Sequence, residues 1–112
     1  MLSKDRRLNL KTDFKWVASG KKLETGYLKL FIRIGNNQEP RIGIAVSGRV
    51  FNNATDRNRA RRLVSAALEA LYLNLPKTIN IVALPKAGVI KVKSGDLLLD
   101  LEAALKNAKI IN

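Results

Sequence analysis

One stretch of this sequence, YLKLFIRIG at residues 27–35, alternates without a break between two sets of side chains. Successive side chains of a β-strand point to opposite faces of a sheet, so this period of two predicts a strand. One face of the strand is entirely aliphatic, which indicates that it belongs to a layered core. The aliphatic set is Leu28, Leu30, Ile32 and Ile34, and the opposite set is Tyr27, Lys29, Phe31 and Arg33.

Other segments supply further strands. The turn-forming residues GNNQEP lead into residues 41–50, RIGIAVSGRV, which we expect to form the antiparallel partner of the first strand. A third strand is predicted at residues 78–85, TINIVALP, where Pro85 ends it. A short extra strand is expected near residues 20–25.

Three helices are predicted from capping residues and apolar periodicity. The first runs from Thr12, as N-cap, to Ser19, and the main helix runs from about Asp56 to Leu73. The last has Ser94 as its N-cap, and its apolar stripe is Leu97, Leu98, Leu101 and Leu105. The order of elements predicts an α+β protein, a single-domain α/β sandwich over residues 1–112, with the sequence α-β-β-(β)-α-β-α.

The start of the main helix, DRNRARR at residues 56–62, is unusually basic. Cations there meet the positive end of the helix dipole, which costs stability, and only Asp56 offsets this locally. A solvated helix face is the alternative, but guanidinium groups match phosphate oxygens, so the cluster predicts an anion-binding site. Most of the cluster falls opposite the apolar stripe, in a sector that also holds Ser65, while Arg59 projects separately.

The charge of the whole chain supports this interpretation. There are 21 Lys and Arg residues against 9 Asp and Glu, a net charge of +12, which calls for a polyanionic partner. Nucleic acid is the first candidate and an anionic membrane surface the second. No apolar run approaches the ~20 residues of a membrane span, and the first residues lack the apolar segment of a secretory signal. We therefore expect a cytoplasmic protein that does not enter membranes.

The residue types needed for catalysis are scarce. Cysteine and histidine are absent, which removes disulfides, thiolate metal sites, the commonest general base and the commonest metal ligand. The acidic residues are scattered, with no spacing that suggests a pair of catalytic or metal-binding carboxylates. We expect no catalytic residue and no metal site in the protein itself.

Aromatic and basic residues interleave on the second face of the first strand, at Tyr27, Lys29, Phe31 and Arg33. Exposed aromatic rings on a sheet stack unpaired bases, and neighbouring cations hold the phosphates. The alternative is that a helix covers this face and Phe31 is a core residue, and both interpretations stay open here. Trp16, the only tryptophan, is expected to be an apolar anchor.

Two segments, IAVSGRV and DRNRARR, resemble the protein subunit of bacterial ribonuclease P. Members of that family carry a strand ending in a Val-Ser-Lys-type segment, a short loop, and an Arg-Asn-Arg motif that opens a long basic helix. The similarity extends to RRLNLKTDFKWV, INIVALP and SGDLLLDLEAAL. This chain departs from the family pattern at Ala18, Gly48, Ser65 and Ala66.

The resemblance implies a protein that binds a large catalytic RNA. The RNA performs the hydrolysis, with Mg²⁺, and the two together remove the 5′ leader of precursor tRNA. The protein would be the non-catalytic subunit, inactive alone, without a cofactor of its own and monomeric when free. The family also implies a left-handed crossover between parallel strands around the main helix.

Two sets of residues are carried over by position. The set expected to contact the RNA subunit is Arg57, Asn58, Arg59, Arg61 and Arg62, together with Arg49. The set expected to form the leader-binding cleft is Phe14, Phe31, Lys29, Arg33 and Ser47. The leading alternative is a ribosomal or other structured-RNA-binding protein with no part in cleavage. A DNA-binding module is less favoured, because no helix-turn precedes the arginines, and a membrane-surface protein comes last.

Overall fold

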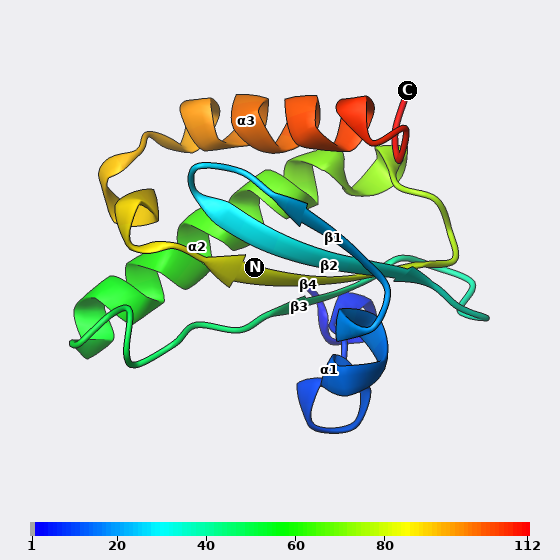
Figure 1. Ribbon diagram of the computed structural model, residues 1–112, viewed down its shortest axis with the longest axis horizontal. Coiled ribbons are helices and arrows are strands. Elements are labelled where there is room, and N and C mark those ends of the chain that lie inside the picture. Colours follow the sequence, from blue (N-terminus) through cyan, green and yellow to red (C-terminus); the bar gives the residue numbers. More distant parts are fainter. Residues whose placement is uncertain (1) are drawn as a thin grey trace.

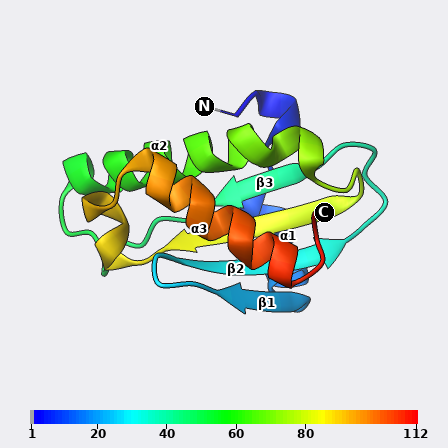
Figure 2. The same ribbon diagram turned by 90° about the horizontal axis from the view of Figure 1, so that it is seen from above.

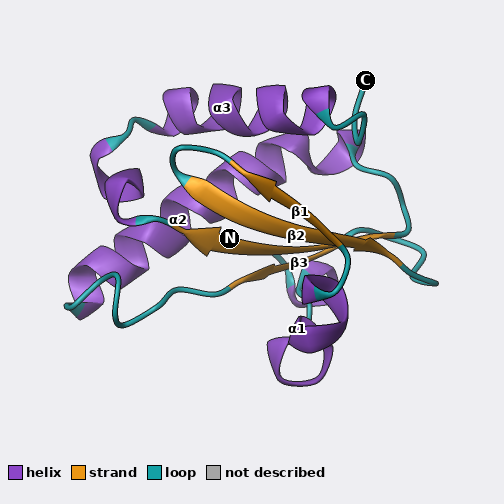
Figure 3. Ribbon diagram, viewed as in Figure 1, coloured by secondary structure: helices purple, strands orange, loops and turns teal. Residues whose placement is uncertain are grey.

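A single four-stranded sheet separates the helices into two layers in the computed structural model, which describes residues 2–112 (Figure 1). Helix α1 (Leu10–Ala18) lies on one face of the sheet, and α2 (Ala54–Leu71) and α3 (Ser94–Asn107) cover the other (Figure 3). The strands are β1 (Lys21–Glu24), β2 (Leu28–Ile34), β3 (Arg41–Ile44) and β4 (Ile79–Pro85). Short 3-10 helices lie at η1 (Lys4–Arg6), η2 (Tyr72–Asn74) and η3 (Ala87–Lys91). The α+β class and the element order are those predicted.

The pairing of the strands differs from the prediction. The order is β1-β2-β4-β3, so β3 does not pair with β2 but lies parallel to β4, while β4 lies antiparallel to β2. The reason is that six of the seven residues of β4 are buried, whereas β2 buries alternate residues. A strand apolar on both faces takes a central position, so β4 inserts between the two strands that precede it in the chain. Strand β3 is also shorter than expected and ends at Ile44.

The connection from β3 through α2 to β4 is left-handed (Figure 2). In Figure 2 the molecule is seen from the side of α2, both strands point to the left, and β4 (yellow) lies below β3. A chain that leaves β3, passes in front of the sheet through α2 and enters β4 therefore makes a left-handed turn. The general preference is strongly for right-handed crossovers. The handedness implied by the family resemblance is therefore confirmed. The crossover brings the first turns of α2 to the end of the sheet where β3 finishes.

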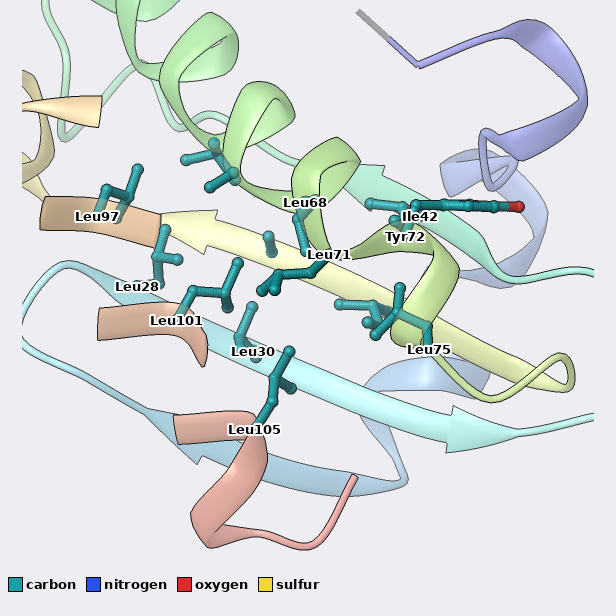
Figure 4. Close-up of a cluster of buried hydrophobic side chains, with 14 of the residues drawn as sticks. Leu28, Leu30, Ile42, Leu68, Leu71, Tyr72, Leu75, Leu97, Leu101 and Leu105 are labelled. Carbon is teal, nitrogen blue, oxygen red and sulfur yellow. The ribbon is translucent and has the colours of Figure 1, made fainter. Parts of the chain in front are cut away.

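The main core lies between the sheet and helices α2 and α3 (Figure 4). The predicted stripe of α3 is confirmed, with Leu97, Leu101 and Leu105 fully buried and Leu98 partly buried. Ile34, expected in the aliphatic face, is 57 % exposed because it lies at the end of β2. Ser65, expected in the basic sector of α2, is 2 % exposed and packs toward β3 and the N-terminal segment. The buried arc of α2 is thus wider than its hydrophobic residues suggest.

Helix starts differ from the predictions by one to three residues, because asparagines cap two of the helices. The Asn9 side chain accepts the N–H of Lys11 at 3.1 Å, so α1 begins before Thr12. The Asn53 side chain accepts the N–H of Asp56 at 2.8 Å and donates to its carboxylate at 3.2 Å. Asp56 is therefore the third residue of α2. Ser94 lies inside α3 as its first residue.

A second, smaller apolar cluster lies under α1, on the other face of the sheet. Leu8, Val17 and Val82 are buried there, and Phe14 and Phe31 are partly buried against them. Gly43 of β3 allows the start of α1 to approach the sheet closely, since a Cβ atom at Gly43 would lie 2.6 Å from the Cδ2 of Leu10. Helix α1 therefore covers part of the aromatic and basic face of β2. Phe31 is neither fully exposed for stacking nor fully buried in the core, so each of the two interpretations of that face holds in part.

Gly20 sets how closely the turn after α1 packs on the sheet. A Cβ atom at this position would collide with the carbonyl oxygen of Ile32, a backbone atom that cannot move alone. We expect Gly20→Ala to lower the free energy of unfolding by about 1–3 kcal/mol, the usual cost of overpacking. Gly26→Ala is the matched control, because nothing lies within 4 Å of its Cβ position. Urea denaturation measures both, and equal stability of the two variants would contradict the packing argument.

Candidate nucleic-acid interface

The first turns of α2 hold the basic cluster, and the structure gives its arginines different roles. Arg57 is half-buried and donates to the carbonyl oxygen of Phe51 at 2.9 Å, which ties the preceding loop to the helix. Arg59 donates through Nε to the carbonyl of Ile90 in η3 at 3.0 Å, in keeping with its separate projection. Arg61 donates to the Asn58 side chain at 3.0 Å, one turn away. A guanidinium group has five N–H donors, so each of these arginines keeps donors for a ligand.

No arginine of this cluster forms an ion pair with a carboxylate within residues 2–112. The ion pairs found there are Lys86–Glu24 and Lys106–Glu102, and neither includes an arginine. Arg62 and Arg49 are exposed, and their side chains have no hydrogen-bond partner in the described part of the chain. Asp56 is the one carboxylate in the first turn of α2, so most of the positive charge at this helix start is uncompensated, in the position where the helix dipole disfavours it.

A groove of about 510 Å³ lies beside this surface, and we call it the Lys29 groove. Ala45 of the segment after β3 and Leu84 of β4 line it, and so do Lys29, Ser47 and Arg49. Two residues predicted for the leader cleft are thus brought together with one predicted to contact the RNA subunit. The remaining lining residues are Glu24, Val50, Pro85, Lys86 and Ala87.

The wall formed by Ser47 and Arg49 is tied to the start of α2. The N–H of Arg49 donates to the Ser47 hydroxyl at 3.1 Å, and the N–H of Phe51 donates to the Ser47 carbonyl at 3.0 Å. The carbonyl of Phe51 in turn accepts from Arg57. One short run of hydrogen bonds therefore connects the groove to the arginine cluster, so the two form a continuous surface.

The opposite wall of the groove carries an ion pair that sequence reasoning missed. Lys86 Nζ lies 3.2 Å from a carboxylate oxygen of Glu24 and donates to the carbonyl of Thr25 at 2.7 Å. The hydrogen bond and charge of Lys86 lower the pKa of the Glu24 carboxyl. These residues are 62 positions apart and meet only because Leu28 pairs with Pro85 across β2 and β4. No local pattern in the sequence reveals this contact.

The other residues predicted for the cleft lie outside the groove. Phe14 and Phe31 belong to the half-buried cluster under α1, which touches the groove only through Leu84. Arg33 turns away, donating to the carbonyl of Trp16 at 3.1 Å and to the Ser19 hydroxyl. Trp16 itself is 39 % exposed, so its prediction as an apolar anchor is wrong. Trp16 lies in the last turn of α1, and the Arg33 guanidinium, not a core side chain, lies over one face of its ring.

Residues 2–112 contain no group of three or more acidic side chains placed to share a metal ion. No helix in that range is both long enough and apolar enough to cross a bilayer. What the surface does provide is fixed cationic donors around a shallow groove, which suit a nucleic-acid backbone.

Fold and surface together define a basic α+β RNA-binding protein. The chain belongs to the ribonuclease P protein family, whose sequence profile, described as Ribonuclease P, matches residues 2–109. The resemblance drawn from IAVSGRV and DRNRARR is thereby confirmed.

Individual relatives agree with this membership. The chain is 33 % identical to the ribonuclease P protein component of a Pseudanabaena species, over the whole chain and 98 % of that protein. It is 31 % identical to the corresponding protein of Pseudoalteromonas atlantica, over 93 % of this chain and 87 % of that one.

Solved structures show the same fold. The RNase P protein of Thermotoga maritima, in complex with a fluorophenyl thiourea, superposes with a TM-score of 0.79 and 28 % identity. That match covers 89 % of this chain and 97 % of the other. The RNase P protein of Staphylococcus aureus gives a TM-score of 0.81 at 20 % identity, over 96 % and 98 % of the two chains.

The different bonding of Arg57 and Arg62 leads to a testable contrast. Arg62→Ala removes only a free cation, so stability should change by less than about 0.5 kcal/mol. For this variant the slope of log affinity for structured RNA against log salt concentration should become shallower by about 0.7 to 0.9. Arg57→Ala also removes the bond to Phe51, so it should lower the free energy of unfolding by about 1 kcal/mol. Urea denaturation and salt-titrated RNA binding measure the two effects. An unchanged salt slope in Arg62→Ala would make the cluster a solvated face.

Proposed function

We propose that this chain, as a member of the ribonuclease P protein family, serves as the non-catalytic protein subunit of the enzyme. It binds the catalytic RNA through the start of α2 and holds the 5′ leader of precursor tRNA in the Lys29 groove. One observation carries the proposal: hydrogen bonds through Ser47 and Phe51 join the groove to the arginine cluster. A protein built this way can contact a folded RNA and an unpaired strand side by side.

The RNA subunit occupies the arginine surface in this proposal. The residues are those predicted from the sequence, Arg57, Asn58, Arg59, Arg61 and Arg62, with Arg49 at the border of the groove. Their charge is unfavourable at a helix start in the free protein. Phosphate groups reverse the sign of that contribution, since they bind guanidinium donors and the positive helix end together. The RNA thus completes a site that is electrostatically incomplete in the protein alone.

The leader strand occupies the Lys29 groove. Lys29 and Arg49 supply cations outside any ion pair, and Ala45 and Leu84 leave the floor low enough for a strand to lie across it. Glu24 holds Lys86 in place and repels phosphate from that edge, so the strand is steered toward Lys29 and Arg49. Phe31 and Phe14 border the groove through Leu84 and offer partly exposed ring surface for a base.

Hydrolysis belongs to the RNA subunit, which uses Mg²⁺. The chain supports this division because it has no histidine and its carboxylates are dispersed. The protein therefore contributes binding and orientation only. We place the free protein in the cytoplasm as a monomer of one RNA-binding domain.

Reconstitution tests the proposed function. Mixed with the RNA subunit of a ribonuclease P, labelled precursor tRNA and Mg²⁺, the chain should raise the rate of leader removal at low salt. The purified protein without RNA should cleave nothing, with or without Mg²⁺, because the chain has no histidine and residues 2–112 hold no acidic group placed to share a metal ion. Cleavage by an RNA-free preparation would contradict the division of labour. Tight binding of the RNA without any gain in cleavage would favour a structured-RNA-binding protein of another kind.

Lys29 allows the groove to be tested separately from the arginine surface. Lys29→Ala should weaken holoenzyme binding of a precursor with a leader of several nucleotides and reduce its salt slope by about 0.7. A precursor with a one-nucleotide leader should bind almost as before, because it does not reach the groove. Lys77→Ala is the matched control, an exposed lysine outside the groove. Equal losses on both precursors would place the leader elsewhere.

A further inference from the structure

Trp16 lies in an unusual setting for a tryptophan, near the end of α1 with 39 % of its surface exposed. The Arg33 guanidinium lies over its ring, 4.8 Å from the centroid. Arg33 is itself held by the carbonyl of Trp16 and the hydroxyl of Ser19. The ring and the guanidinium thus form a fixed stack rather than two mobile side chains.

A hollow of about 530 Å³ adjoins this stack, and we call it the Trp16 hollow. Its lining residues are Asp13, Trp16, Asn36, Asn37, Arg41 and Asn80. The two inner amides are rigidly placed, since Asn80 donates to Asn37 at 2.9 Å and Asn37 donates to the carbonyl of Ile79 at 3.1 Å. Gly35 keeps the loop against the ring, because a Cβ there would lie 2.8 Å from the Cη2 of Trp16. The hollow is therefore formed in advance of any ligand.

The Trp16 hollow is separate from the Lys29 groove. The two share no lining residue, and they lie on the same face of the sheet at opposite ends of β4. Asn80 borders one and Leu84 the other, four residues apart, or about 13 Å along the strand. Helix α1 lies over the sheet between them, packed on Phe31 and Val82. Neither the arginine surface nor the groove makes use of this hollow.

We propose that the Trp16 hollow binds one unpaired RNA nucleotide, with guanine preferred. The base stacks on the Trp16 ring, whose π-face accepts any base, and the exposed guanidinium of Arg41 holds a neighbouring phosphate. The inference rests on the RNA-binding function proposed above and adds a second position where an unpaired strand contacts the protein.

The preference for guanine follows from Asp13. Its carboxylate has no hydrogen-bond partner in residues 2–112 and lines the hollow one helical turn before Trp16. An ionised carboxylate only accepts hydrogen bonds, so it selects a base edge that presents adjacent donors. Guanine offers its N1–H and its amino group side by side, whereas each other base presents an acceptor next to its donor. The same carboxylate repels phosphate, which leaves Arg41 as the phosphate contact.

The fluorescence of Trp16 provides a direct assay, because it is the only tryptophan. The probes are three eight-nucleotide RNAs: uridines with a central guanosine, with a central adenosine, and with an abasic central site. We expect saturable quenching by the guanosine RNA and weaker quenching by the adenosine RNA. The abasic RNA keeps only uridines that can stack and should quench least of the three RNAs, and inorganic polyphosphate should bind without quenching. Equal quenching by polyphosphate would show that the ring senses charge alone, and would overturn the proposal.

Variants in the hollow test each role by fluorescence anisotropy of the labelled RNAs. Trp16→Leu keeps apolar volume but loses the stack, so affinity for the guanosine RNA should fall by roughly 5- to 150-fold. Asp13→Asn should erase the preference for guanosine over adenosine. Arg41→Ala should make the slope of log affinity against log salt concentration shallower by about 0.7. Leu99→Ala, an exposed side chain on α3, is the control and should change nothing. Unchanged affinity in a folded Trp16→Leu protein would overturn the site, and an intact preference in Asp13→Asn would overturn the base assignment.

The outcome is independent of the cleavage assay. Binding of short RNAs by the free protein measures the hollow, whereas reconstitution with the RNA subunit measures the proposed function. Quenching without any support of cleavage would leave the hollow as a nucleotide site in some other RNA-binding protein. Support of cleavage without quenching would leave the proposed function standing and remove the hollow.

Discussion

The burial of β4 on both faces is the constraint on which the rest of this structure depends. A strand with apolar side chains above and below must lie inside a sheet and be covered by helices on both sides. It therefore takes the place between β2 and β3, although both precede it in the chain. Helices α2 and α3 cover one face, and α1 with its small cluster covers the other. The left-handed crossover through α2 belongs to this solution.

The same topology assembles the nucleic-acid surfaces. Because β3 and α2 meet at one end of the sheet, the loop that carries Ser47 and Arg49 runs directly into the basic helix start. Because β2 and β4 are neighbours, Lys29 faces Leu84, and Lys86 reaches Glu24. The arginines at the positive end of the helix dipole, offset only by Asp56, make the free protein less stable than it could be. The destabilising charge lies at the start of α2, where an anionic partner such as RNA can offset it. The electrostatics of the fold are in this way linked to RNA binding.

The three surfaces differ in how they are built, and this difference bears on specificity. In the proposed function the arginine surface contacts phosphate, so it would position an RNA without reading its bases. The Lys29 groove is shallow and cationic, which suits a strand of any sequence. Of the three surfaces, the Trp16 hollow combines a fixed ring with a carboxylate, which we propose distinguishes base edges. In this arrangement affinity comes from charge spread over the surface, while any preference for a base comes from one small site.

The sequence by itself determined the element types, the basic helix start and the family, because these are local properties. Period-two alternation, helical stripes and the DRNRARR segment are each written within a few neighbouring residues. Tertiary structure alone decided that β4 separates β2 from β3, that α1 half-covers Phe31, and that Arg33 stacks on an exposed Trp16. It also decided which arginines stay free, since Arg57 and Arg59 bond to carbonyl groups of Phe51 and Ile90. These contacts depend on strand pairing and packing between distant segments, where competing partners differ by small energies that no local pattern records.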